Sequence, residues 1–312
     1  MAGQRISAQV LEKPAHTVIR HQAERLLKEA DKAVRRLKDA HDAEALHDSR
    51  VALRRLRGWF QAFQVELPLK HKWRRALKQL AHSSNDARDA QVCQDWLSKL
   101  KRCPDAQFSA ELDALRKERY HEVRDELPAK WRRLARRLRR TAAELGTRGS
   151  PFRRRFTASL RSYAQDFERA RIQAHRWAVP SNIHALRIAG KKLRYLLDVI
   201  LKREAVTDAL MTEIEELHDS AGSIQDLQRL QALAEQGFLR RADKQYHRLL
   251  TARSTRRHPG LAPELVSLLQ IGRAARREQI RRIARFRKAY LEKTSPRYVR
   301  ELRRVIRGLE SR

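Results

Sequence analysis

Apolar residues recur along most of the chain at spacings of three and four residues, with charged residues between them. This period is that of an α-helix with one buried face. The first such segment runs from Pro14 to about Ala40 and has Val18, Leu26 and Leu37 among its apolar positions. The pattern therefore predicts amphipathic helices that each add a narrow apolar stripe to the core.

Helix-capping and helix-breaking residues divide the rest of the chain. Asp42 and Ser181 are expected to cap helices, Pro128 to interrupt or kink one, and Gly222 to mark a turn. The predicted helices after the first cover approximately residues 42–64, 68–82, 87–103, 105–145, 151–175, 181–201, 202–221, 223–236, 238–250, 261–292 and 298–309.

The chain also repeats itself without gaps. The segment 47–57 recurs 137 residues later as 184–194, and the same offset pairs Pro14 with Pro151. Leu80 with Leu217, Ser83 with Ser220, Asp89 with Asp226 and Gln91 with Gln228 match as well. A period this long indicates an internal duplication, which predicts two tandem helical bundles related by pseudo-twofold symmetry. The expected units are a first lobe at 1–148, a second lobe at 149–293 and a C-terminal helical extension at 294–312.

Composition supports an all-α fold. Only 41% of the 312 residues are hydrophobic and 34% are charged, so the core must consist of thin stripes. Ten Gly and nine Pro leave few signals for strands and turns, whereas good helix formers dominate.

Charge points to a polyanionic partner. The chain has 70 Lys and Arg against 37 Asp and Glu, a formal net charge of +33. Such a field attracts polyanions, although composition does not say which one. Cys93 and Cys103 are too few for a disulfide framework and lack metal-ligand spacing, which fits a reducing compartment. Without a signal peptide or an apolar run long enough for a membrane, we expect a cytoplasmic protein with no membrane partner.

The duplicated segment predicts two cationic rows. Its first, fourth, eighth and eleventh residues fall in one narrow sector of a helix, and apolar residues occupy the opposite side. Guanidinium groups bind phosphate oxygens in bidentate fashion, and the like charges within each row cost some helix stability. A single row of basic residues could simply be a solvated helix face. Because both copies retain the row, phosphate binding is favoured. The rows are His47, Arg50, Arg54 and Arg57, then His184, Arg187, Lys191 and Arg194.

Several roles stay open for the shared histidines and aspartates. His47 and His184 are compatible with phosphate donation, packing or catalysis, but no shared carboxylate accompanies them, so we expect no catalytic residues. Asp89 and Asp226, each placed between two predicted helices, are expected to cap helices or orient the basic rows rather than bind a metal. The same offset also matches basic residues on the helices that close the lobes, namely Arg136 with Arg273, Arg139 with Arg276, and Arg140 with Arg277.

These features resemble the conserved histidine α-helical domain, or CHAD, family. The resemblance covers about Pro14 to Glu292. It rests on the doubled His-x-x-Arg-(Val or Ile)-Ala-x-basic-basic-Leu-Arg motif, the Arg194-Tyr195 and Arg88-Asp89 pairs, and Gly222 followed by Asp226. It implies two helical bundles whose basic residues, with Arg88 among them, line a central cavity or groove that binds inorganic polyphosphate, and an association with polyphosphate or polyhydroxyalkanoate granules. Many relatives carry an N-terminal triphosphate-tunnel domain that has no counterpart here, and Ser84-Asn85 replaces the Leu-Gly that often precedes Arg-Asp.

Three functions follow as hypotheses. The first is a non-enzymatic polyphosphate-binding protein that needs no cofactor or metal and meets granule surface proteins. The second is sequence-tolerant nucleic-acid binding, which the charge permits but which lacks an evident stacking platform among the 6% aromatic residues. The third is a phosphohydrolase, for which the sequence has no recognisable metal constellation, Gly-rich phosphate loop or activated nucleophile.

Overall fold

Helices make up the architecture, as the apolar pattern predicts. The computed structural model describes residues 8–39, 42, 44–83, 85–100, 105–200, 205–251, 260–292 and 297–310. Among these residues no strand forms, and a single isolated bridge joins Pro14 to Pro151. The helices are α1 (Ala8–Leu11), α2 (Ala15–Arg36), α3 (Ala45–Ala62), α4 (His71–His82), α5 (Asn85–Lys99), α6 (Ala106–Ala143), α7 (Phe152–Arg176), α8 (Pro180–Ile200), α9 (Ala205–Leu250), α10 (Pro263–Phe286), the π-helix η1 (Arg287–Leu291) and α11 (Arg297–Glu310).

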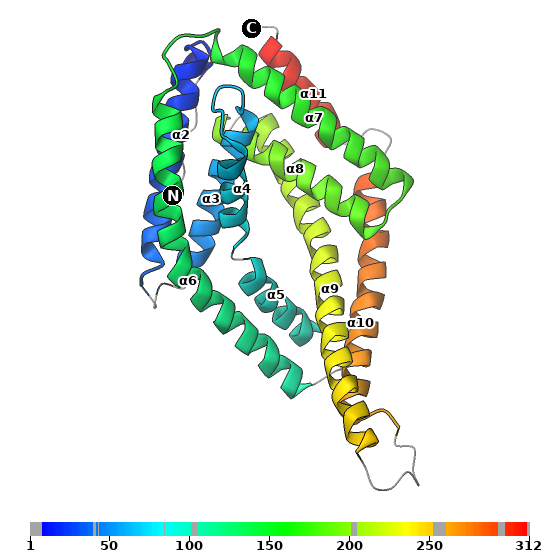
Figure 1. Ribbon diagram of the computed structural model, residues 1–312. Helices are drawn as coiled ribbons and strands as arrows, with labels where there is room; N and C mark the ends of the chain where they lie inside the picture. The colour runs from blue at the N-terminus through cyan, green and yellow to red at the C-terminus, as the bar shows by residue number, and fades with distance from the viewer. Residues whose placement is uncertain are drawn as a thin grey trace.

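The helices pack in pairs that follow the order of the chain. Helix α2 packs on α3 and α6, α7 packs on α8, and α9 packs on α10. Helices α9 and α10 form a long antiparallel pair that projects beyond the other helices at one end (Figure 1). The C-terminal helix α11 packs on α7 and α9, with Tyr298, Val299 and Leu302 buried. The predicted C-terminal extension is therefore a helix that packs on two helices of the second half of the chain.

The main hydrophobic core draws on both halves of the sequence. The rings of Trp59, in α3, and of Phe63, directly after α3, lie 6.3 and 5.7 Å, centroid to centroid, from the Phe152 ring of α7. A second, smaller cluster joins Cys93 and Phe108 from the first half with leucines of α9 and α10. Burying each of these aromatic side chains contributes roughly 1.5–3 kcal/mol. The halves are thus fastened together by shared apolar packing.

The two prolines matched by the repeat also meet in space. The Ala15 N–H donates to the Ser150 carbonyl at 2.9 Å, and the Phe152 N–H donates to the Lys13 carbonyl at 2.8 Å. The 137-residue offset converts one of these hydrogen bonds into the other. The pairing is a local twofold, while the pseudo-symmetry of the complete lobes stays a prediction. Both prolines directly precede their helices and so hold the N-cap position rather than the first helical position.

Helix α6 corrects one prediction about helix breaks. It runs without interruption from residue 106 to 143, through Pro128. Proline removes one backbone hydrogen bond and crowds the preceding turn. Leu127 and Trp131 on either side are both 2% exposed, so packing holds the two segments in one helix. Packing thus prevents the predicted interruption, whereas the alternative prediction of a kink agrees with the change in direction of α6 along its length (Figure 1).

Helix α9 corrects a second prediction, since it continues through the expected turn at Gly222 and the expected break near 236. Leu217, Ala221, Ile224 and Leu227 are all buried, and their spacing keeps one apolar stripe in register across the glycine. Asp226 therefore lies inside a helix, so its predicted role as a cap is wrong. Ser181 likewise lies within the first turn of α8 instead of capping it.

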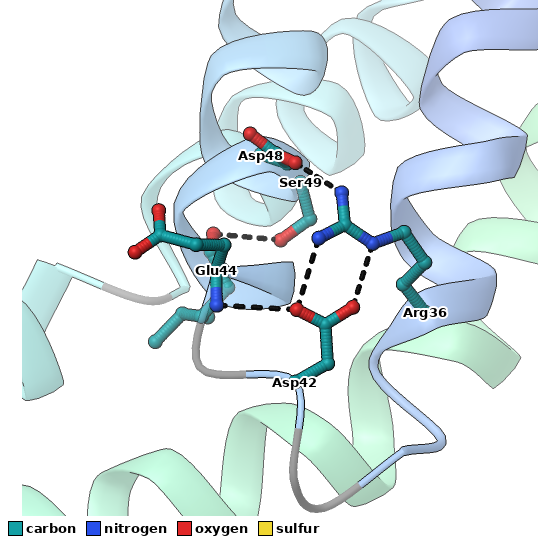
Figure 2. Close-up of polar contacts among 6 residues, drawn as sticks. Arg36, Asp42, Glu44, Asp48 and Ser49 are labelled. Carbon is teal, nitrogen blue, oxygen red and sulfur yellow. Dashed lines mark hydrogen bonds and ion pairs between the residues drawn. The ribbon is translucent and has the colours of Figure 1, made fainter.

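An ion-pair cluster fixes the start of α3 against the end of α2 (Figure 2). Arg36 donates to both oxygens of Asp42, at 2.7 and 2.9 Å, and also to Asp48. The Asp42 carboxylate accepts the Glu44 N–H at 3.2 Å, just before the helix begins. Asp42 thus supports the entry to α3 as expected, although it does not occupy the N-cap position. The contact with Arg36 holds the pKa of Asp42 below its usual value.

Two of the residues named from the sequence, Ser84 and Cys103, lie outside the described residues. Cys93 is a free, buried thiol.

Candidate functional site

Helices α3 and α8, which carry the two predicted basic rows, pack against each other. Gly58 of α3 lies against Tyr195 of α8, and a Cβ atom on Gly58 would lie 3.6 Å from the tyrosine side chain. These two positions are themselves related by the 137-residue offset. The crossing brings the two rows onto one surface.

A cavity of about 710 Å³ opens at this crossing, between α3, α4, α5, α7, α8, α9 and α10. Its charged lining contains ten Lys and Arg but only four Asp. The cations are Arg50, Arg54, Arg57, Arg88, Lys99, Arg187, Lys191, Lys192, Arg229 and Arg282, and the acids are Asp89, Asp95, Asp219 and Asp226. The enclosed space is therefore strongly positive.

Crowding of like charges lowers the pKa of several cations in this cavity. Burial, followed by repulsion from Arg54 and Arg88, lowers the pKa of Arg50 to about 9. Burial, followed by repulsion from Arg54 and Arg187, lowers the pKa of Lys191 to about 6. Arg54 belongs to α3 whereas Arg187 and Lys191 belong to α8, so the repulsion crosses from one row to the other. Such stored repulsion is relieved when an anion enters.

Neutral and polar side chains orient the α3 row. The Asn85 Oδ1 atom accepts from Arg54 at 3.2 Å and from Arg50 at 3.5 Å. The Asn85 amide also contacts His82 at 2.9 Å, and His82 Nε2 lies 2.5 Å from an Arg57 nitrogen. Burial and the nearby Arg57 lower the pKa of His82 to about 4, so the ring is neutral near pH 7. Asn85, one of the two residues that depart from the family pattern, thus fastens two guanidinium groups.

The two shared aspartates lie within the cavity, where the predicted orienting role fits their surroundings. Asp89 accepts from Arg229, and Asp226 lies close enough to Arg187 for the two charges to interact. Burial raises the pKa of both carboxyl groups despite these cations. Among the described residues no group of three or more His, Cys, Asp or Glu is arranged to hold a metal ion.

Gly222 lets Arg187 lie close to α9. A Cβ atom on Gly222 would lie 3.4 Å from Arg187 Nε, and the same Nε donates to the His218 carbonyl at 3.3 Å. The close approach of Arg187 therefore leaves room only for a small residue at position 222, and the turn that the sequence suggested is absent. Burial and repulsion from Arg187 also lower the pKa of His218 to about 4.

Substitution of Gly222 tests this close approach. Gly222→Leu is expected to displace the Arg187 guanidinium and to weaken anion binding about tenfold, the value of roughly one charge-assisted hydrogen bond. Gly222→Ala is the matched control, because its methyl group only reaches van der Waals contact and alanine favours a helix by about 1 kcal/mol over glycine. It should melt at a higher temperature and bind normally. Equal binding by both variants, measured by isothermal titration calorimetry, would contradict this role for Gly222.

The structure separates the predicted site residues into two groups. Six line the cavity from the rows, namely Arg50, Arg54, Arg57, His184, Arg187 and Lys191, and Arg88 joins them from α5. His47 is exposed at the start of α3 and Arg194 pairs with Glu215 at 2.7 Å, so neither lines the cavity. The closing-helix cations also lie outside it: Arg136 and Arg139 border a groove between α2 and α6, while Arg140, Arg273, Arg276 and Arg277 are exposed.

Sequence reasoning missed several residues of the cavity. His82 and Asn85 are absent from the doubled motif because the offset matches them with Asp219 and Gly222, which differ in chemistry. Lys192 lies inside the duplicated segment, but it falls in a different sector of the helix from the four residues of the predicted row. Arg229 and Arg282 come from α9 and α10, and nothing local in the sequence links them to α3. The duplication indicates only those cavity residues whose chemistry is the same in both copies.

In the described part of the chain, no helix is long and apolar enough to cross a membrane.

Comparison with known proteins agrees with this architecture. The crystal structure of the CHAD domain from the plant Ricinus communis superposes with a TM-score of 0.66 over 94% of this chain and 99% of that chain, at 19% sequence identity. At this identity the likeness shows the fold alone. A search of curated proteins finds no match. The family model of the CHAD domain matches residues 17–235, well over half of the sequence, and the chain therefore belongs to the CHAD domain family.

Proposed function

We propose that the protein binds inorganic polyphosphate in the cavity between α3 and α8, without chemical conversion of the polymer. One observation carries this proposal, namely that ten Lys and Arg face only four Asp in a shared, concave space. A cavity that stores this much repulsion gains free energy when a polyanion neutralises it. Membership in the CHAD family supports a polyphosphate-binding type of domain.

The chemistry of the lining suits phosphates that repeat along a thin, flexible chain. Arg54 and Arg57 of α3 face Arg187 and Lys191 of α8, so cations of two helices contact successive phosphates from opposite sides. Guanidinium forks donate paired hydrogen bonds to phosphate oxygens, whereas lysine supplies a compact charge. Release of counterions from the polymer adds to the affinity and makes it fall with salt.

Nucleic acid is the competing ligand, and a direct competition separates the two. We expect fluorescently labelled long-chain polyphosphate to stay bound when duplex DNA is added at equal phosphate concentration and moderate salt. The cavity is enclosed by helices, whereas a duplex needs an outward basic surface. Displacement of polyphosphate by the duplex under these conditions would overturn the proposal.

A binding role also predicts that the polymer survives. Incubation with polyphosphate and magnesium or manganese is expected to release no orthophosphate. Release that disappears in a His47→Ala, His184→Ala double variant would instead establish a phosphohydrolase. In the cell, we propose a cytoplasmic protein that meets polyphosphate or polyhydroxyalkanoate granules, which labelling the protein in granule-forming cells tests directly.

A further inference from the structure

A second basic hollow lies apart from the cavity. It is a groove of about 900 Å³ between α2 and α6, and no residue lines both spaces. Seven of its lining residues are Lys or Arg and one is acidic. The cations are Arg35, Lys38, Lys130, Arg132, Arg133, Arg136 and Arg139.

The positive charge of this groove is poorly neutralised by the protein. Its single acid, Asp31, accepts from Trp131 Nε1 at 2.9 Å and from Arg139. Lys130 pairs with Glu126. Lys38, Arg132, Arg133 and Arg136 form no ion pair within the described residues. In that part of the chain, four neighbouring cations thus lack a counter-ion, and each is exposed.

The second copy of the repeat lacks most of these cations. At the 137-residue offset, Trp131 of the groove and the nearby Leu134 match Leu268 and Ile271, which are also buried. Five of the seven groove cations, in contrast, match residues that are neither Lys nor Arg: Ile172, His175, Ser267, Leu269 and Gln270. The buried apolar positions of α6 therefore recur in α10, which packs on α9, whereas most of the groove charge does not recur. The charge of the α2–α6 groove is thus not part of the core pattern that both copies share.

The lining of the groove suits a thin anionic chain. Cations border the groove from both sides, with Arg35 and Lys38 on the α2 side and the other five on α6. Trp131 is 2% exposed and cannot stack on a base. The groove is therefore suited to recognise closely spaced negative groups through flexible cations on both of its sides.

We propose that the α2–α6 groove is a second polyphosphate site, independent of the central cavity. This inference rests on the proposed function, because it assigns the same polymer to another surface. A long chain held at two places gains affinity by multivalency, with no change at either site. Short chains occupy the two sites separately.

The test counts sites by titration calorimetry with short-chain polyphosphate. Wild type is expected to bind two chains per protein, and a groove variant with Lys38, Arg133 and Arg136 changed to Gln is expected to bind one. With long-chain polyphosphate the groove variant should bind about tenfold more weakly or worse. A variant with Arg300, Arg303 and Arg307 of α11 changed to Gln is the matched control and should behave as wild type. All substituted side chains are exposed, so folding is preserved, and circular dichroism checks it.

Other outcomes overturn the inference in distinct ways. If wild type and the groove variant bind equal numbers of short chains, the groove is not a polyphosphate site. If the groove variant loses affinity for duplex DNA but not for polyphosphate, the groove is a nucleic-acid surface. The central cavity is tested separately with the Arg54→Gln, Lys191→Gln double variant. If this variant binds short chains as wild type does while the groove variant still loses one site, the cavity proposal fails and the groove proposal stands.

Discussion

Replacing Arg50, Arg54, Arg187 and Lys191 together by Gln is expected to weaken binding of long-chain polyphosphate by about a hundredfold or more. Hydrogen bonds to charged groups are each worth about 1.5–3 kcal/mol, and a tenfold change in affinity corresponds to about 1.4 kcal/mol. Removing two such hydrogen bonds without compensation already accounts for this decrease. Titration calorimetry at fixed salt measures it.

The salt dependence of the same variant gives a second, independent number. Each phosphate contact on a single strand contributes about 0.7 to the slope of log affinity against log salt, so removing four cations should reduce the slope by about three. A variant with the exposed Arg297, Arg300, Arg303 and Arg307 of α11 changed to Gln removes an equal number of cations outside the cavity and should retain most of its affinity. If both variants weaken binding equally, net charge rather than the cavity governs the interaction.

The four substitutions should leave the fold intact. The positive forms of these four residues repel one another within the cavity, and burial already lowers the pKa of three of them, Arg50, Arg187 and Lys191. Glutamine retains hydrogen-bonding capacity without the repulsion. We expect a melting temperature within a few degrees of wild type, measured by circular dichroism. Loss of cooperative unfolding would show that these cations support folding instead.

The second large effect is a dependence on pH that centres on Lys191. The pKa of Lys191 is about 6 in the free protein, so its amine is mostly neutral at pH 7.5. Bound phosphates favour the charged ammonium form and raise this pKa. At a pH between the pKa of Lys191 in the free protein and its higher pKa in the complex, binding therefore takes up a proton. Affinity should rise as the pH falls towards 6, by up to about tenfold per pH unit, and level off below that value.

Titration calorimetry in buffers with different heats of ionisation measures this uptake directly. At pH 7.5 wild type is expected to take up about one proton per bound chain. Lys191→Arg keeps the charge at all pH values and should abolish most of the uptake, whereas Lys192→Arg on the same helix is the control and should not. His82 and His218, each with a pKa of about 4, contribute only in more acidic solution. An uptake of zero in wild type would contradict a neutral Lys191.

The order and character of the helices could be read from the sequence with few errors. Periodic apolar positions determine which face of a helix is buried, and α4 ends at His82 as predicted. Local rules fail at Ser181 and Gly222, and at Pro128 they allow an interruption that does not occur, because tertiary packing holds each of these residues in a helix. Propensities describe an isolated segment, whereas buried neighbours such as Trp131 and Ala221 decide its conformation in the folded chain.

The candidate site was predictable only in part for a related reason. Duplication singled out Arg50, Arg54 and Arg57 with Arg187 and Lys191, because the same positions recur in both copies. It also singled out His47, which is exposed, and Arg273, Arg276 and Arg277, which are exposed on α10. Helical periodicity tells which side chains share a face, but it does not tell what that face meets.

The sequence by itself determined that this chain is helical, duplicated, strongly basic and a member of the CHAD family, because these properties depend on spacing and composition along the chain. Only the tertiary structure decided that two rows of like charge face each other, that Asn85 and His82 hold one of them, and that Gly222 makes room for Arg187. Those relations join residues on different helices. They depend on how α3, α5, α8 and α9 pack, which no local pattern encodes.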